Sequence, residues 1–268
     1  MIEFLIEPLT YEFMRTALAT AVVVGLTAST LSVFVVLRGW SLLGDAISHS
    51  VLPGLAFSAA FNLPLTLGGA VAGVVASLLV ALVESRSRVR NDTAIGIVLT
   101  GAFALGLVII SRIRPTVDVF HILFGNVLGV SPQDLLLTAA LGFVVILLIS
   151  LFMKEIIAFT FDPLFTYVVG LPTNLIHYSL MIMMSLTIIA ALQTVGIVLV
   201  ISLLVAPGAT AQLFARTLGQ MLLVSLTVGV FSSVAGLYLS YYFAVSSGGA
   251  IALTATLVFF SAMMLKRR

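Results

Sequence analysis

The sequence of 268 residues contains no cysteine, which excludes disulfide bonds and thiolate metal ligands. Charged side chains are also scarce: they make up 8% of the chain, against roughly 25% in a typical soluble domain. A soluble protein with so few charges would expose large apolar patches and aggregate, so a soluble globular fold is excluded. The formal net charge of +2 is too small to indicate a nucleic-acid partner.

Apolar residues, by contrast, are abundant: 61% of the chain is hydrophobic and the mean hydropathy is +1.28. A helix that crosses a membrane needs about 20 mostly apolar residues. Candidate stretches lie at 13–37, 40–61, 65–83, 93–111, 134–153, 175–191, 195–206, 218–243 and 250–265. The sequence therefore predicts an all-α, polytopic integral membrane bundle, organised as one transmembrane domain over residues 1–268.

The number of spans depends on the region 175–215. Its two apolar stretches are short, and Pro207-Gly208 interrupts the second. We therefore expect one of them to be broken or re-entrant, which gives about eight spans in total, against nine if both cross the membrane.

The orientation follows from the basic residues. Residues 84–92 contain Arg86, Arg88 and Arg90, which is the strongest cytoplasmic marker in the chain. Three predicted spans precede this loop, so the N-terminus is expected outside. Lys154, Arg216 and the C-terminal basic triplet then fall inside, whereas Arg112 and Arg114 fall outside, against the rule.

Two ionisable residues stand alone in an apolar region. Asp45 and His49 are the only such side chains between Arg38 and Glu84. Charged or titratable groups within a membrane are costly unless they face a partner or a wet cavity. Four residues apart on a helix, they lie on one face, and a carboxylate with an imidazole suits a divalent transition metal. The metal prefers a neutral imidazole, so uptake should weaken as His49 becomes protonated.

Other interpretations of these and neighbouring polar residues stay open. Asp45 could instead cap a helix, and His49 could bond a neighbouring helix. For Ser48 and Ser50, a packing role is favoured over metal ligation. We expect Asp118 and His121 to lie in a solvated loop and His177 to lie at an interface.

Residues 154–170 are interfacial rather than spanning. Asp162-Pro163 is a typical N-cap followed by a first helical residue. Phe161, Leu164 and Phe165 would give this short cytoplasmic helix an exposed apolar face. We favour a protein partner that buries this apolar face; the alternative is that the helix lies on the lipid surface.

Four stretches, taken together, resemble one family: the permease subunits of the metal-ion importers of the ATP-binding-cassette class, which carry manganese, zinc or iron. The stretches are Leu-Leu-Gly-Asp-Ala-Ile-Ser-His-Ser-Val-Leu-Pro-Gly (42–54), Asp-Thr-Ala-Ile-Gly-Ile-Val-Leu-Thr-Gly-Ala-Phe-Ala-Leu-Gly (92–106), Phe-Asp-Pro-Leu-Phe (161–165) with Gly170, and Thr-Val-Gly-Ile-Val-Leu-Val-Ile-Ser-Leu-Leu-Val-Ala-Pro-Gly-Ala-Thr-Ala (194–211).

The resemblance implies a homodimeric permease in a bacterial plasma membrane, working with two cytoplasmic ATP-binding subunits and an extracytoplasmic metal-binding protein. It implies that Asp45 and His49 line the metal path. It also implies that Phe161, Asp162, Pro163, Leu164 and Phe165, with Gly170, belong to the helix that docks on the ATPase. The chain has no Gly-Lys-Ser/Thr phosphate loop, so ATP hydrolysis must occur on another polypeptide.

The cargo and two other functions remain to be distinguished. The lack of sulfur ligands and the presence of Asp45 favour manganese, with zinc next and iron third. A stand-alone carrier driven by an ion gradient is the main alternative, although such carriers usually spread several ionisable groups over different helices. An intramembrane metalloenzyme would need a fuller ligand set, and the sequence has no His-Glu-x-x-His motif.

Overall fold

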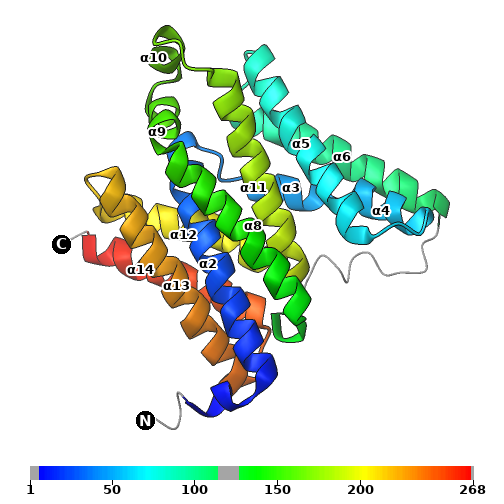
Figure 1. The fold of residues 1–268 in the computed structure, drawn as a ribbon, viewed down its shortest axis with the longest axis vertical. Coiled ribbons are helices and arrows are strands. Elements are labelled where there is room, and N and C mark those ends of the chain that lie inside the picture. Colours follow the sequence, from blue (N-terminus) through cyan, green and yellow to red (C-terminus); the bar gives the residue numbers. More distant parts are fainter. Residues whose placement is uncertain (1–5, 114–126, 267–268) are drawn as a thin grey trace. The chain divides into compact units, whose positions relative to one another are not determined.

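The computed structural model describes residues 6–113 and 127–266, and this part of the chain is helical, with no strand (Figure 1). Eight of its helices are long and apolar enough to cross a membrane. They are α2 (Glu12–Arg38), α5 (Leu65–Arg86), α6 (Asn91–Ile113), α8 (Pro132–Leu151), α11 (Thr173–Val195), α12 (Ile197–Phe214), α13 (Leu218–Phe243) and α14 (Ser247–Lys266). The predicted all-α membrane bundle is confirmed.

Six shorter elements complete the described chain. They are η1 (Glu7–Thr10), α3 (Leu43–Ser50), α4 (Leu52–Ala60), η2 (Val127–Gly129), α9 (Met153–Phe161) and α10 (Pro163–Val168). None of them has the length of a span on its own.

The prediction of one continuous helix over 40–61 is wrong, because the chain breaks there into α3 and α4. Val51 lies between the two helices, and Pro53 is the second residue of α4. Proline has no N–H to donate and crowds the preceding turn, so the helix ends before it and restarts. The break is bridged by the Val51 N–H, which donates to the Ile47 carbonyl at 3.2 Å.

The interruption expected within 175–215 is absent, because α11 and α12 are both long enough to span. They meet at Gly196, which has a positive φ of 85°. Pro207 lies inside α12, and the helix continues past it. The Gly208 N–H donates to the Ser32 hydroxyl of α2 at 2.8 Å, and a neighbouring hydroxyl of this kind lets a membrane helix tolerate proline.

The described chain packs as two compact units. The first comprises 6–36, 127–144 and 190–266, and the second comprises 37–113 and 145–189. In the first unit, α12, α13 and α14 pack on one another. The Ser225 hydroxyl of α13 donates to the Ser29 carbonyl of α2 at 2.7 Å, which ties these helices together. The single domain over residues 1–268 stays a prediction.

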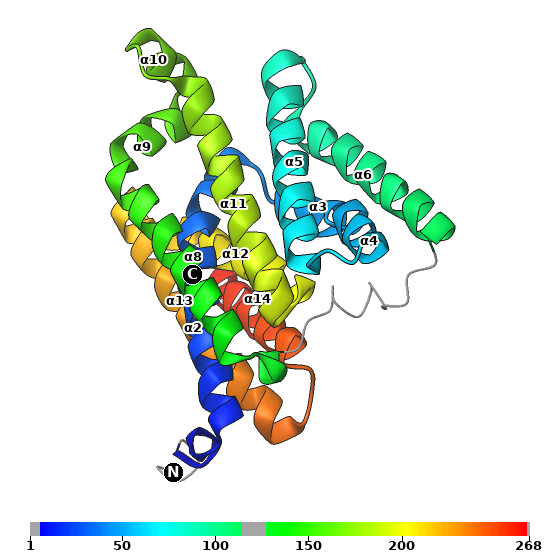
Figure 2. The same ribbon diagram turned by 45° about the vertical axis from the view of Figure 1, so that its right-hand side comes forward.

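In the second unit, α3 and α4 pack against α5 and α6, as both views show (Figures 1 and 2). The closest approach is between Gly54 of α4 and Gly68 of α5. A Cβ on Gly54 would clash with the carbonyl oxygen of Gly68, and a Cβ on Gly68 would clash with that of Gly54. Small residues allow membrane helices to come this close.

The C-terminal ends of α2 and α5 lie in one side-chain cluster. Arg38 ends α2 and its guanidinium lies over the Trp40 ring, which stacks on His177. His177 in turn contacts Glu84, near the end of α5. Both helix ends therefore belong to one membrane face, and α3 with α4 must carry the chain across. This agrees with the predicted orientation, in which three crossings precede residues 84–92.

Candidate metal site

The helix α3 presents Asp45 and His49 together on its one exposed stripe. Asp45 Oδ1 lies 3.3 Å from His49 Nε2, and the two side chains are 43% and 36% exposed. The remaining residues of α3 are buried. The predicted placement of the pair on one face, one turn apart, is confirmed; its role in metal transport stays a prediction.

The pair opens into a pocket of about 340 Å³ whose other wall is α6. The lining residues are Asp45, His49, Leu99, Thr100 and Phe103. The Thr100 hydroxyl donates to the Gly96 carbonyl at 2.8 Å, so its oxygen lone pairs remain for another partner. This pocket can receive an ion that is only partly stripped of water.

Phe103 holds the imidazole of His49 from the side. The two rings meet nearly at right angles, at 87°, with centroids 5.7 Å apart. Aromatic contacts of this kind favour one ring orientation by about 0.5–1.5 kcal/mol. His49 is therefore preorganised to present Nε2 toward Asp45.

The contribution of α6 to this pocket is not predicted by the sequence. One signal was present: between Thr93 and Ser111, Thr100 is the one residue with a polar side chain. A lone hydroxyl at mid-span is weak evidence on its own, because it can bond its own helix, as Thr100 does. That Thr100 lies near α3 depends on tertiary packing, which the hydrophobic pattern of the sequence does not reveal.

The ligand set offered by this chain is small. Among the described residues, no group of three or more His, Cys, Asp and Glu side chains could hold a metal ion. A metal ion bound by Asp45 and His49 would therefore keep several coordination positions for water or other oxygen atoms. Such an incomplete shell suits a site from which the ion must leave again.

Two other polar candidates among the described residues, His177 and Ser48, do not line this pocket. His177 Nε2 is 3.1 Å from Glu84 Oε2, in a buried pair. Ser48 donates to the Gly44 carbonyl at 2.8 Å, which fits the packing role expected for it. Asp118 and His121 lie outside the described residues.

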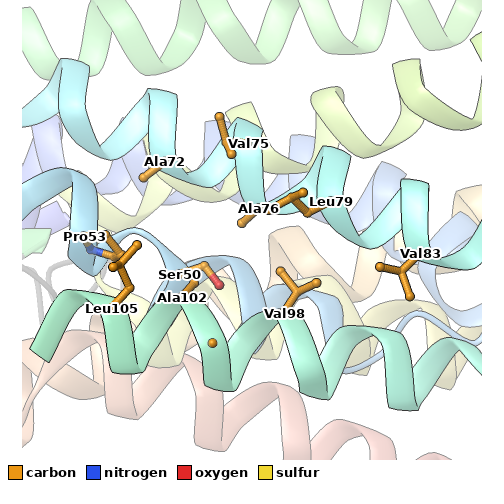
Figure 3. Close-up of a pocket in the computed structure, with 11 residues that line it drawn as sticks. Ser50, Pro53, Ala72, Val75, Ala76, Leu79, Val83, Val98, Ala102 and Leu105 are labelled. Atoms are coloured by element: carbon orange, nitrogen blue, oxygen red, sulfur yellow. The ribbon is translucent and has the colours of Figure 1, made fainter. Parts of the chain in front are cut away.

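Ser50 points into a second pocket of about 360 Å³ between α5 and α6 (Figure 3). Apart from its hydroxyl, alanine, valine, leucine, proline and glycine line this space. It holds no ionisable side chain, so we do not assign it to the metal path.

The helix α10 begins as the sequence predicts. Asp162 is its N-cap, and its Oδ1 accepts the Phe165 N–H at 2.9 Å. Pro163 is the first residue, and Gly170, with a φ of +85°, follows the helix. Six apolar side chains are more than half exposed: Phe161, Leu164, Phe165, Tyr167, Val168 and Val169. The short helix and the residues beside it thus expose an apolar surface.

Comparison with known proteins gives consistent matches over almost the whole chain. The ABC 3 transport family matches residues 10–266. The manganese transport system membrane protein MntB of Synechocystis sp. is 46% identical over 97% of this chain and 85% of its own length. The probable iron transport system membrane protein of Haemophilus influenzae is 43% identical over 94% and 93%. A chain of PsaBC from Streptococcus pneumoniae, solved in complex with Fab, superposes with a TM-score of 0.84 at 40% identity, covering 98% and 95%.

Proposed function

The chain belongs to the ABC 3 transport family, and on that premise we propose that it is the membrane permease subunit of an ATP-driven importer of Mn²⁺. It is a multi-pass protein of the bacterial plasma membrane. The observation that carries the proposal is the Asp45–His49 pair, which lines an open pocket in an otherwise apolar group of helices.

Manganese is the proposed cargo, ahead of zinc and iron. The donors are one carboxylate, one imidazole and a nearby hydroxyl, with no sulfur. This set suits a hard or borderline divalent cation. Relatives of similar identity are named for manganese and for iron, so the metal has to be measured.

The mechanism that we propose is alternating access. An extracytoplasmic metal-binding protein delivers the ion to the outer side, and the ion exchanges part of its water for Asp45 and His49. Two copies of the permease form the pathway, and each contributes its pair. Motion of two cytoplasmic ATP-binding subunits enters through α10 and opens the path inward.

The exposed apolar face of α10 supports the proposed ATPase contact. Phe161, Leu164 and Phe165 are 63%, 72% and 56% exposed on a segment outside the long helices. Burying them under a protein partner would gain roughly 25 cal/mol for each Å² of apolar surface removed from water.

The test is uptake of Mn²⁺ into liposomes that contain the permease, its ATPase and its binding protein. Asp45→Ala and His49→Ala should each abolish uptake while the complex still assembles, because an ion with one protein ligand is held too weakly. Leu42→Ala is the matched control: Leu42 is 56% exposed just before α3 and lies outside the pocket, so uptake should persist.

Full transport by both alanine variants would reject the role of the pair. Uptake by the permease alone, driven by an ion gradient without the ATPase, would instead favour the stand-alone carrier. Parallel runs with Mn²⁺, Zn²⁺ and Fe²⁺ identify the cargo.

A further inference from the structure

A buried cluster of five side chains joins the ends of four helices, at a place that the metal site does not use. It consists of Arg38, Trp40, Glu84, Phe159 and His177 and is called the Trp40 cluster below. Trp40 is fully buried, and the side chains of His177 and Glu84 are 9% and 6% exposed.

Stacking holds most of the cluster together. The Trp40 and His177 rings are nearly parallel, 12° apart, with centroids at 5.5 Å. Phe159 lies 5.5 Å from the His177 ring, and the Arg38 guanidinium lies 4.5 Å from the Phe159 centroid. Flat side chains stacked in this way are displaced together rather than singly.

The polar part of the cluster is only half satisfied. His177 Nε2 contacts Glu84 Oε2 at 3.1 Å. Buried polar atoms on three members have no hydrogen-bond partner: Arg38 Nε, Trp40 Nε1 and Glu84 Oε1. Unpaired buried polar groups are costly, so an arrangement that pairs them would compete with this one. Two competing arrangements are what an element needs in order to transmit motion.

On one side, the cluster adjoins the helix that bears the metal pair. Trp40 precedes Asp45 by five residues, and the turn between them is tight. The Leu43 N–H donates to the Trp40 carbonyl at 2.8 Å, and the Ala46 N–H donates to the Leu42 carbonyl at 3.0 Å. A displacement of Trp40 therefore shifts the first turn of α3, which contains Asp45.

On the other side, the cluster holds both supports of α10. Phe159 lies in α9, three residues before the N-cap Asp162, and His177 lies in the first turns of α11. The segment from α9 to α11 carries α10 between these two anchors (Figure 1). All these residues belong to the same compact unit as α3 and its pocket.

We propose that the Trp40 cluster positions α3 according to the state of α10, and so couples ATP-driven motion to opening of the metal pocket. Its members are positioning residues, because none of them lines the pocket. The inference rests on the proposed function, since it takes α10 as the ATPase contact.

The experiment measures Mn²⁺ uptake and ATP hydrolysis in the same liposomes with the assembled complex. Trp40→Leu keeps an apolar side chain but removes the stacked ring. Hydrolysis should continue, whereas Mn²⁺ taken up per ATP hydrolysed should fall by about tenfold, within the usual range of coupling between sites. Trp40→Phe restores a ring and should restore the ratio.

The control is Ile149→Ala, which removes an equally buried side chain of α8 outside the cluster. A purely structural loss lowers uptake and hydrolysis together and leaves their ratio unchanged. If Trp40→Leu does not assemble, Phe159→Leu replaces it, with the same expected fall in the ratio.

If the wild-type complex imports Mn²⁺ and the assembled Trp40→Leu variant takes up as much Mn²⁺ per ATP hydrolysed as the wild type, this inference alone is overturned. A wild-type complex that hydrolyses ATP without importing Mn²⁺ overturns the proposed function and this inference with it.

Discussion

Phe103 illustrates how a single residue from another helix can position a candidate ligand. Asp45 and His49 come from one helix and were evident from the sequence, because ionisable groups stand out in an apolar span. Phe103 and Thr100 come from α6 and complete the pocket. No local pattern predicts that these two helices meet, so the sequence identified the candidate ligands but not their support.

Replacement of Phe103 should weaken metal capture without removing a ligand. In Phe103→Ala the His49 ring loses its edge-to-face neighbour and gains freedom, which costs about 0.5–1.5 kcal/mol. We expect the Mn²⁺ concentration at half-maximal uptake to rise by about two- to tenfold, from the same energies. Leu107→Ala, one turn further along α6 and outside the pocket, serves as control. If uptake depends on the Mn²⁺ concentration in the same way in Phe103→Ala and Leu107→Ala, a positioning role for Phe103 is contradicted.

At the scale of elements, two prolines show why the hydrophobic pattern predicts the positions of long helices better than the positions of helix breaks. Pro53 and Pro207 both lie in apolar stretches, yet the chain breaks beside Pro53 and continues through Pro207. The difference lies in Ser32 of α2, distant in sequence, whose hydroxyl accepts the Gly208 N–H and donates to the Val205 carbonyl at 3.4 Å. The N-cap at Asp162 was predictable because its partner is only three residues away.

The crossing of α4 and α5 makes a sharp prediction about glycine. In Gly54→Ala the new methyl group meets the Gly68 carbonyl, so the helices must separate, at a cost of about 1–3 kcal/mol. The detergent-solubilised protein should unfold at a lower temperature. Gly96→Ala is the matched control, because a Cβ on that α6 residue meets nothing within 4 Å. Equal melting temperatures for the two variants would rule out a tight crossing.

At the scale of the whole molecule, the orientation in the membrane rests on two observations. The arginines of 84–92 favour the cytoplasm, and the Trp40 cluster joins the C-terminal ends of α2 and α5. Between those ends, α3 and α4 carry the chain to the opposite face. The turn before α5 should therefore lie outside the cell.

The absence of cysteine makes this orientation easy to measure. Leu63→Cys, in the exposed turn before α5, should react with a membrane-impermeant thiol reagent added to intact cells. Ser87→Cys, in the exposed loop after α5, should react only after the membrane is permeabilised. The unmodified chain is the background and should give no signal. The opposite labelling pattern would show that the orientation in the membrane is the reverse of the one predicted.

The proposed metal pocket and the proposed ATPase contact lie in one compact unit but on separate helices. The pocket is lined from α3 and α6, and the exposed apolar surface belongs to α10 and the residues beside it. A substitution that changes ion preference therefore need not disturb recognition of the motor subunit. Permeases that descend from one ancestor can therefore diverge in the ion that they carry while they keep the surface that binds the ATP-binding subunit.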